Sequence, residues 1–283
     1  MSANPEIHSS VSLRSCEKCP LHNAANLRRL GVNTVGFDHV VALLGNPNTG
    51  KSTVFNALTG LRQHVGNWTG KTVARAEGAF HHRGRTFKLV DLPGAYSLFS
   101  SSHHEEIARD FVLFGQPDVT VVVVDATRLE RNLVLVLQAL EITDRVVVAL
   151  NLMDEARRHA IEIDVRALSR RLGIPVVPMA ARQGEGIPDL LRAIEEIVSG
   201  AFVPHPRQVN HQSESLERAL SDLVPQIEAE FPHLPNARWV ALRLLDGDHS
   251  IIQAIREGTL GNVDQMERRA MPSLNRPGLI EET

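Results

Sequence analysis

The sequence predicts an α/β protein with a doubly wound, mostly parallel sheet, followed by a small all-helical domain. Short, wholly apolar runs recur between residues 40 and 177 and alternate with amphipathic helical patterns. Such runs are typical of strands that are buried on both faces of a parallel sheet. Beyond residue 213 only helical patterns remain. The alternation over residues 38–200 therefore indicates one doubly wound domain, and the helical remainder indicates a second unit.

The predicted strands and helices follow one another along the first domain. Strands are predicted over residues 40–44, 85–90, 119–124, 146–150 and 175–177, with an edge strand over 72–80. Helices are predicted over residues 53–58, 132–142, 165–172 and 187–198, where apolar side chains recur at helical spacing.

A linker separates this domain from the helical one. Residues 199–212 hold two prolines, a glycine and few apolar side chains, which is typical of a connecting segment. Three helical segments follow: a stripe from Leu216 to Ile227 that we expect Pro225 to interrupt, a second segment around Trp239, and a third that starts at Ile251. We therefore divide the chain into an N-terminal extension (1–37), an α/β domain (38–200), a helical domain (213–265) and a tail (266–283).

Composition excludes several classes of protein. The 283 residues carry a formal charge of −3, which argues against a strongly basic nucleic-acid binder. Two cysteines cannot form a disulfide framework. The purely apolar runs, such as residues 40–44 and 121–124, are far shorter than the roughly 20 residues of a membrane span, and the N-terminus lacks signal-peptide features. We expect this chain to be soluble and cytoplasmic, with no nucleic-acid partner.

A glycine-rich motif follows the first predicted strand and precedes a helix. It reads GxxxxGK[ST], in the context that a phosphate-binding loop requires. Its backbone N–H groups and the helix N-terminus favour a phosphate anion. Lys51 would reach the β- and γ-phosphates, and the Ser52 hydroxyl would bind Mg²⁺. The predicted nucleotide-binding residues of this segment are Gly45, Asn46, Pro47, Asn48, Thr49, Gly50, Lys51, Ser52 and Thr53.

Two further segments complete the predicted phosphate end of the site. Asp91-Leu92-Pro93-Gly94 follows the strand at 85–90, so Asp91 could hold Mg²⁺ through water and the Gly94 N–H could meet a γ-phosphate. Thr72 lies in a polar loop before the predicted edge strand, where a threonine can bind Mg²⁺ while the γ-phosphate is present.

The predicted base-binding residues follow the last two strands. Asp154 could accept hydrogen bonds from guanine N1–H and N2–H₂, which adenine lacks. Asn151 would tie this loop to the phosphate loop. Ala180 and Ala181 follow the predicted strand at residues 175–177, where a backbone N–H could meet guanine O6. These contacts predict a preference for GTP and GDP, while ATP stays open as an additional substrate.

Together these segments resemble a known family. GNPNTGKSTVFNALTG, VGNWTGKTV, VDLPGAYSL and NLMDEA are similar to the cytosolic P-loop GTPase domain of the ferrous iron transport protein B family, bacterial inner-membrane Fe²⁺ transporters. The segment with RWVALRLLDGD resembles that family's helical spacer domain. The resemblance implies GTP hydrolysis at the cytoplasmic face of the membrane, coupled to an iron-conducting membrane domain of the same protein outside this chain. It leaves open whether copies associate into a homo-oligomer.

The resemblance also implies roles in catalysis. Asn46 matches the family's ligand for an activating K⁺, and Thr72 and Gly94 match the two switch segments. Lys51, Thr72, Gly94 and Asn46 are therefore the predicted catalytic residues. Many GTPases position the attacking water with a Gln after the DxxG glycine, but this chain has Ala95 there. We hypothesise that backbone groups near Thr72 and Gly94 take over that positioning.

Two alternative functions stay open at this stage. One is a regulatory GTPase of the ribosome- or RNA-associated type, which the charge of −3 disfavours. Another is a metal-sensing module, because Cys16, Cys19 and His22 have ligand-like spacing. We also expect Glu105 and Glu106 to form a solvated helix face rather than a part of the site.

Overall fold

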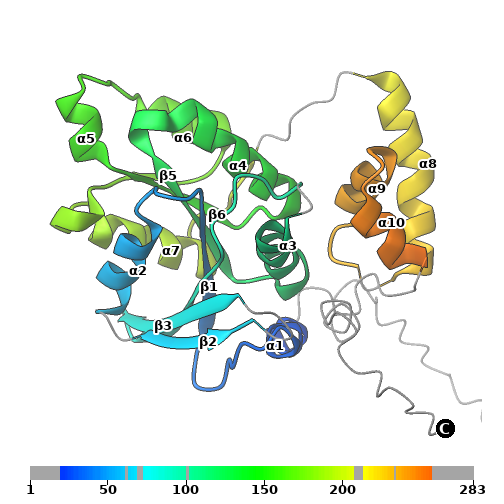
Figure 1. Cartoon of the computed structure of the whole chain (residues 1–283), viewed down its shortest axis with the longest axis horizontal. Helices are drawn as coiled ribbons and strands as arrows, with labels where there is room; N and C mark the ends of the chain where they lie inside the picture. The colour runs from blue at the N-terminus through cyan, green and yellow to red at the C-terminus, as the bar shows by residue number, and fades with distance from the viewer. Residues whose placement is uncertain are drawn as a thin grey trace, which may run out of the picture.

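The computed structural model describes residues 20–60, 63–68, 73–99, 102–206, 213–232 and 234–256. Within these residues a seven-stranded sheet is covered by helices on both faces, and three further helices lie to one side of it (Figure 1). The strands are β1 (His39–Gly45), β2 (Gln63–Asn67), β3 (Ala74–His82), β4 (Arg85–Asp91), β5 (Val119–Asp125), β6 (Val146–Asn151) and β7 (Val176–Pro178). The predicted α/β class with a mostly parallel sheet and a following helical domain is confirmed.

The sheet has the strand order β2-β3-β4-β1-β5-β6-β7. Strand β1 pairs in parallel with β4 on one side and with β5 on the other, while β2 and β3 add antiparallel pairs beyond β4. The expectation that residues 72–80 form an edge strand is wrong, because β2 covers the outer side of β3. Strand β2 (QHVGN) contains one strongly apolar residue, the exposed Val65, so it leaves no apolar run in the sequence.

Two apolar cores lie on opposite faces of the sheet. One contains side chains from α2 (Lys51–Thr59) and α7 (Ile187–Val198). The other contains side chains from α1 (Pro20–Arg29), α3 (His103–Asp110), η2 (Phe111–Gly115), α4 (Leu129–Ile142) and α6 (Val165–Leu172). Short helical segments η3 (Ala126–Arg128), α5 (Met153–Arg158) and η4 (Ala181–Gln183) complete this domain. The interior residues of β1, β5 and β6 are buried, as their apolar runs predict.

Helix α1 is an element that the weak N-terminal pattern did not reveal. Its Leu27 is buried in the core beside η2. Arg75 of β3 donates hydrogen bonds to the carbonyl oxygens of Leu30 and Gly31, at 3.1 and 2.7 Å. A cationic side chain thus meets the carbonyls that directly follow the C-terminus of the helix, where the helix dipole favours positive charge.

The helical unit consists of α8 (Glu214–Glu230), α9 (Ala237–Leu245) and α10 (His249–Arg256). Pro225 does not interrupt α8, contrary to the sequence prediction. Leu220 and Ile227, one on each side of the proline, are both buried in the same core, so packing holds the helix together across the missing N–H. None of the helices in the described part of the chain has the length and apolar character needed to cross a membrane.

The helical unit contacts the first domain through polar and aromatic groups. The Asn236 side chain donates to the carbonyl oxygens of Glu141 and Ile142, at 3.0 and 3.1 Å, where α4 ends. Arg109 of α3 donates to the Ser250 hydroxyl of α10 at 3.2 Å. Phe99, which follows the DxxG segment, lies 6.3 Å from Trp239 between ring centroids.

Candidate functional site

The phosphate loop joins β1 to α2 at the centre of the sheet. Asn46 and Thr49 are buried, whereas Pro47 and Asn48 are exposed on the outer side of the loop. The Thr49 hydroxyl donates to the Asn46 carbonyl oxygen at 2.9 Å, which closes the loop on itself. Ser52 and Thr53 lie exposed in the first turn of α2, and Lys51 begins that helix.

Gly50 occupies a position that only glycine fits. Its φ of +83° lies in the left-handed region. A Cβ built on Gly50 would come within 2.4 Å of the Asn151 side-chain nitrogen. The second glycine of the motif is therefore required both by the backbone conformation and by the close approach of Asn151.

The DxxG segment, residues 91–94, lies against the phosphate loop. The Leu92 N–H donates to the Leu43 carbonyl oxygen at 3.0 Å, and the Ala95 N–H donates to that of Gly45 at 3.2 Å. A Cβ added to Gly94 would lie 3.3 Å from the Pro47 side chain. The structure thus brings the two predicted phosphate-binding segments together.

Lys51 and Asp91 form an ion pair at this junction. The Lys51 ammonium also donates to the Leu92 carbonyl oxygen at 2.8 Å. Burial raises the pKa of the Asp91 carboxyl above its ordinary value, and the neighbouring Lys51 ammonium opposes that shift. A carboxylate and a cation, both largely shielded from water, therefore lie at the carboxyl ends of β1 and β4.

Oxygen donors for cations are present at the same place. The Ser52 hydroxyl and the Asp91 carboxylate are of the type that Mg²⁺ prefers. The Asn46 side-chain oxygen is buried and has no hydrogen-bond partner among the described residues. A buried polar oxygen without a partner is costly unless a ligand satisfies it, so Asn46 fits the K⁺-ligand role expected for it.

Asn151 ties the loop after β6 to the phosphate loop, as predicted, and it also bonds to the loop after β7. Its side-chain nitrogen donates to the Thr49 carbonyl oxygen at 3.0 Å, and its side-chain oxygen accepts the Ala181 N–H at 3.0 Å. With 1% of its surface exposed, Asn151 makes both bonds away from water. One side chain thus fixes the distance between two loops that are far apart in the sequence.

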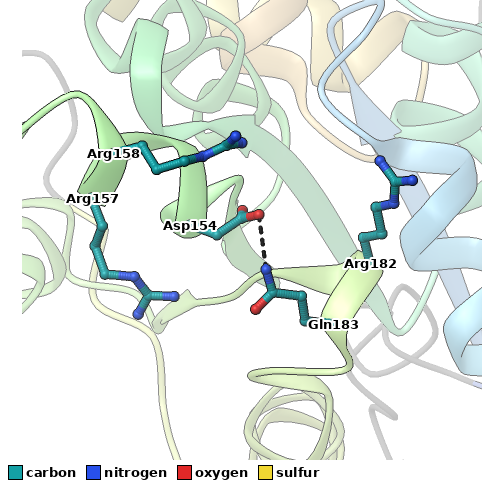
Figure 2. Close-up of a pocket in the computed structure, with 5 residues that line it drawn as sticks. All are labelled: Asp154, Arg157, Arg158, Arg182 and Gln183. Carbon is teal, nitrogen blue, oxygen red and sulfur yellow. Dashed lines mark hydrogen bonds between the residues drawn. The ribbon is translucent and has the colours of Figure 1, made fainter.

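Asp154 lines an open cavity of about 740 Å³ at the same edge of the sheet. Its carboxylate accepts a hydrogen bond from the Gln183 side chain at 3.1 Å. Figure 2 shows this pair, with Arg182 on one side of Asp154 and the arginines of α5 on the other; the lining residues are Asp154, Arg157, Arg158, Arg182 and Gln183. Sequence reasoning selected Asp154 of these five, because the others follow no recognisable spacing.

The backbone amides of Ala180 and Ala181 are engaged within the loop. The Ala180 N–H donates to the Glu185 carbonyl oxygen at 3.1 Å, and the Ala181 N–H donates to Asn151. Their expected contact with a base stays a prediction.

Glu105 is a part of the site that sequence reasoning misjudged. The expected solvated face is wrong for this residue, which is 8% exposed. Its carboxylate accepts the N–H groups of Tyr96 and Ser97 at 3.0 and 2.9 Å, and the Ser102 hydroxyl at 2.5 Å. Glu105 therefore holds the segment that follows DxxG. Glu106 is partly exposed, and its carboxylate Oε2 lies 4.0 Å from Nδ1 of His103.

Some predicted residues lie outside the described part of the chain. Thr72 is one of them, and so are Cys16 and Cys19; the side chain of His22 is also not described. Within the described residues, His, Cys, Asp and Glu side chains form no group of three or more that could hold a metal ion.

Comparison with known proteins agrees with this arrangement. The family model for ferrous iron transport protein B matches residues 39–194, and that for the FeoB cytosolic helical domain matches residues 213–274. The Fe(2+) transporter FeoB of Methanocaldococcus jannaschii is 48% identical over 222 residues, which are 78% of this chain and 33% of that protein. The Escherichia coli K12 transporter is 43% identical over 212 residues, 74% of this chain and 27% of the relative. This chain thus spans about a third or less of these relatives.

Solved structures extend the similarity to both domains. The cytosolic domain of L. pneumophila FeoB is 34% identical, with a TM-score of 0.70 over 82% of this chain and 94% of that one. The cytosolic domain of T. maritima FeoB in a GDP form is also 34% identical, with a TM-score of 0.71 over 82% and 92%. The fold, the phosphate loop and the helical unit agree with the family models: this chain belongs to the ferrous iron transport protein B family, and it contains that family's P-loop G domain followed by its cytosolic helical domain.

Proposed function

We propose that this chain binds GTP, hydrolyses it to GDP and phosphate, and serves an Fe²⁺ transporter from the cytoplasmic face of a bacterial inner membrane. The observation that carries the proposal is the Asn151 side chain, which bonds to Thr49 of the phosphate loop and to Ala181 of the loop near Asp154. A nucleotide needs its phosphates and its base recognised at a fixed separation, and this side chain sets that separation.

The phosphate end would bind the triphosphate and Mg²⁺. Lys51, now paired with Asp91, would turn its ammonium toward the β- and γ-phosphates, because phosphate oxygens offer it stronger anionic partners. Ser52 and Asp91 would then hold Mg²⁺, Asp91 through water. This ion would neutralise charge on the phosphate oxygens.

Water would attack the γ-phosphorus, breaking its bond to the bridging oxygen and releasing phosphate and GDP. Such a reaction depends mainly on positioning and charge stabilisation. Ala95 stands where many GTPases have Gln, so we assign the positioning of the water to backbone groups near Thr72 and Gly94. Asn46 would hold K⁺, which supplies positive charge beside the phosphates.

The base end would select guanine. The Asp154 carboxylate would accept hydrogen bonds from guanine N1–H and N2–H₂, and adenine would leave it unpaired. Similar relatives are named Fe(2+) transporters. We therefore propose that nucleotide turnover acts on an iron-conducting membrane domain of the same protein.

Steady-state phosphate release tests the proposal. It is measured with GTP and with ATP, each in KCl and in NaCl at equal ionic strength, with Lys51→Ala as the inactive control. We expect faster release with GTP than with ATP and faster release in KCl. Equal GTP rates in the two salts would remove the K⁺ role, and no Lys51-dependent GTP hydrolysis would overturn the function.

A further inference from the structure

We propose that the ion pair between Arg157 and Glu185 fastens the loop of residues 180–185 to helix α5 and thereby sets how long a guanine nucleotide stays bound. We call this loop the base loop. The inference rests on the proposed function and adds a positioning role for two residues that belong to no recognised motif.

The ion pair joins the two elements that form the base end of the site. Arg157 donates to both carboxylate oxygens of Glu185, at 2.9 and 2.7 Å. Arg157 lies about one helical turn after Asp154 on α5, and Glu185 lies at the end of the base loop. A two-bond contact of this kind fixes the orientation of both groups as well as their distance.

The two ends of the base loop are tied to each other. The Ala180 N–H bonds to the Glu185 carbonyl oxygen, so the two ends of the loop are held together. Gly186 follows with a φ of +82°, and a Cβ there would come within 2.5 Å of Met179. An outward movement of Glu185 would therefore pull on Ala180 at the other end of the loop.

The residues inside the loop are those that face the candidate base site. Gln183 donates to Asp154, and the Ala181 N–H donates to Asn151. Arg157 and Gln183 also line the cavity beside Asp154 (Figure 2). The cavity thus has α5 on one side and the base loop on the other, and the ion pair spans the two sides. Breaking the pair would let the sides separate and the base leave.

The Arg157–Glu185 pair is exposed to solvent, so it can break while the rest of the domain stays folded. The side chains of Arg157 and Glu185 are 55% and 45% exposed. Their mutual hydrogen bonds raise the pKa of Arg157 and lower that of Glu185, so the contact favours the charged form of each. Exposed pairs contribute little to global stability and weaken with salt. We therefore expect their loss to change nucleotide release more than folding.

Release of a fluorescent GDP analogue, chased with excess GDP in a stopped-flow instrument, tests the inference. We expect Arg157→Ala and Glu185→Ala each to speed release several-fold, with association little changed and with melting temperatures close to that of the unmodified chain. The charge-reversed double variant, Arg157→Glu with Glu185→Arg, should release the analogue more slowly than either single reversal. Added salt should speed release from the unmodified chain more than from Arg157→Ala.

Arg158 provides the charge-matched comparison. It lies on the same helix and lines the same cavity, but it pairs with Glu155 within α5. Arg158→Ala should change release less than Arg157→Ala. Equal acceleration by both, or unchanged release from Arg157→Ala, would overturn the inference while leaving the proposed function intact. If the unmodified chain fails to bind the analogue, both the inference and the proposed function are overturned.

Discussion

Arg243 of the helical unit lies over the ring of Phe99, with 4.0 Å between the guanidinium carbon and the ring centroid. Phe99 belongs to the segment that follows DxxG, and Arg243 belongs to α9. A cation over an aromatic face is attracted by the ring's electron density. The helical unit is therefore attached directly to a segment that leads away from the phosphate end of the site.

The first prediction concerns this contact. Arg243→Ala and Phe99→Ala should each lower the free energy of unfolding, and the two effects should not add. Their coupling should be about 0.5–1 kcal/mol, the usual range for a partly exposed cation–aromatic pair. Urea unfolding of both single variants and the double variant measures it.

Arg218→Ala is a suitable control for that cycle. Arg218 forms an exposed pair with Glu214 on α8, so its loss should change stability by less than about 0.5 kcal/mol. Strict additivity of Arg243→Ala and Phe99→Ala would show that the two side chains do not support each other.

The second prediction concerns the Asn151 bridge. Asn151→Ala would leave the Thr49 carbonyl and the Ala181 N–H buried without their partner. The free energy of unfolding should fall by about 1–3 kcal/mol, because buried polar groups without partners are costly. Guanine nucleotide affinity should fall at least about tenfold, equivalent to 1.4 kcal/mol. Isothermal titration with GDP and denaturant unfolding measure the two effects.

A stable Asn151→Ala variant with unchanged GDP affinity would contradict that account. Loss of stability without loss of affinity would limit Asn151 to a structural role. Asn132→Ala offers a comparison, since Asn132 is also buried but bonds to the Arg128 carbonyl and the Asp125 N–H rather than to the phosphate loop. It should lower stability with little effect on affinity.

The third prediction concerns Glu105. Glu105→Ala removes the acceptor of two backbone N–H groups, those of Tyr96 and Ser97. Those amides should exchange with solvent much faster, and stability should fall by about 1–3 kcal/mol. Glu105→Gln keeps one carbonyl oxygen as an acceptor. Its amide exchange rates and its stability should therefore lie between those of the unmodified chain and those of Glu105→Ala. Hydrogen exchange followed by NMR resolves the two amides.

Glu106→Ala is the matched control, because the neighbouring carboxylate is partly exposed. It should leave the exchange of Tyr96 and Ser97 unchanged and alter stability by less than about 0.5 kcal/mol. If Glu106→Ala had the same effect as Glu105→Ala, the general charge of the helix, and not the specific acceptor, would be responsible.

These examples separate what the sequence could predict from what it could not. The phosphate loop and Asn151 were predictable, because each lies at a fixed offset from an apolar strand and its chemistry depends on local spacing. Strand β2 was not, because it pairs on one side only with β3 and buries little apolar surface. Sheet pairing, rather than its own residues, makes it a strand.

The sequence also could not predict which polar side chains are buried. Glu105 follows two histidines in a polar stretch, and a carboxylate there is ordinarily solvated. It is buried because the loop after DxxG directs two backbone N–H groups at it. Gln183 was missed for a similar reason, since its proximity to Asp154 arises from the packing of the base loop on α5. Both depend on contacts that no spacing in the sequence encodes.

The last prediction concerns Asn46 and separates its effect on stability from its effect on K⁺-stimulated GTP hydrolysis. Its buried side-chain oxygen has no partner among the described residues, so Asn46→Ala removes an unsatisfied group. We expect the free energy of unfolding in sodium buffer to change little or to rise, because an unpaired buried oxygen is itself unfavourable. In potassium buffer the variant should lose the stimulation of GTP hydrolysis while keeping its GDP affinity within a few fold. Parallel unfolding and phosphate-release measurements in the two salts test this. Retained K⁺ stimulation would show that the cation binds elsewhere, and a large loss of stability in sodium buffer would show that the side chain already has a structural partner.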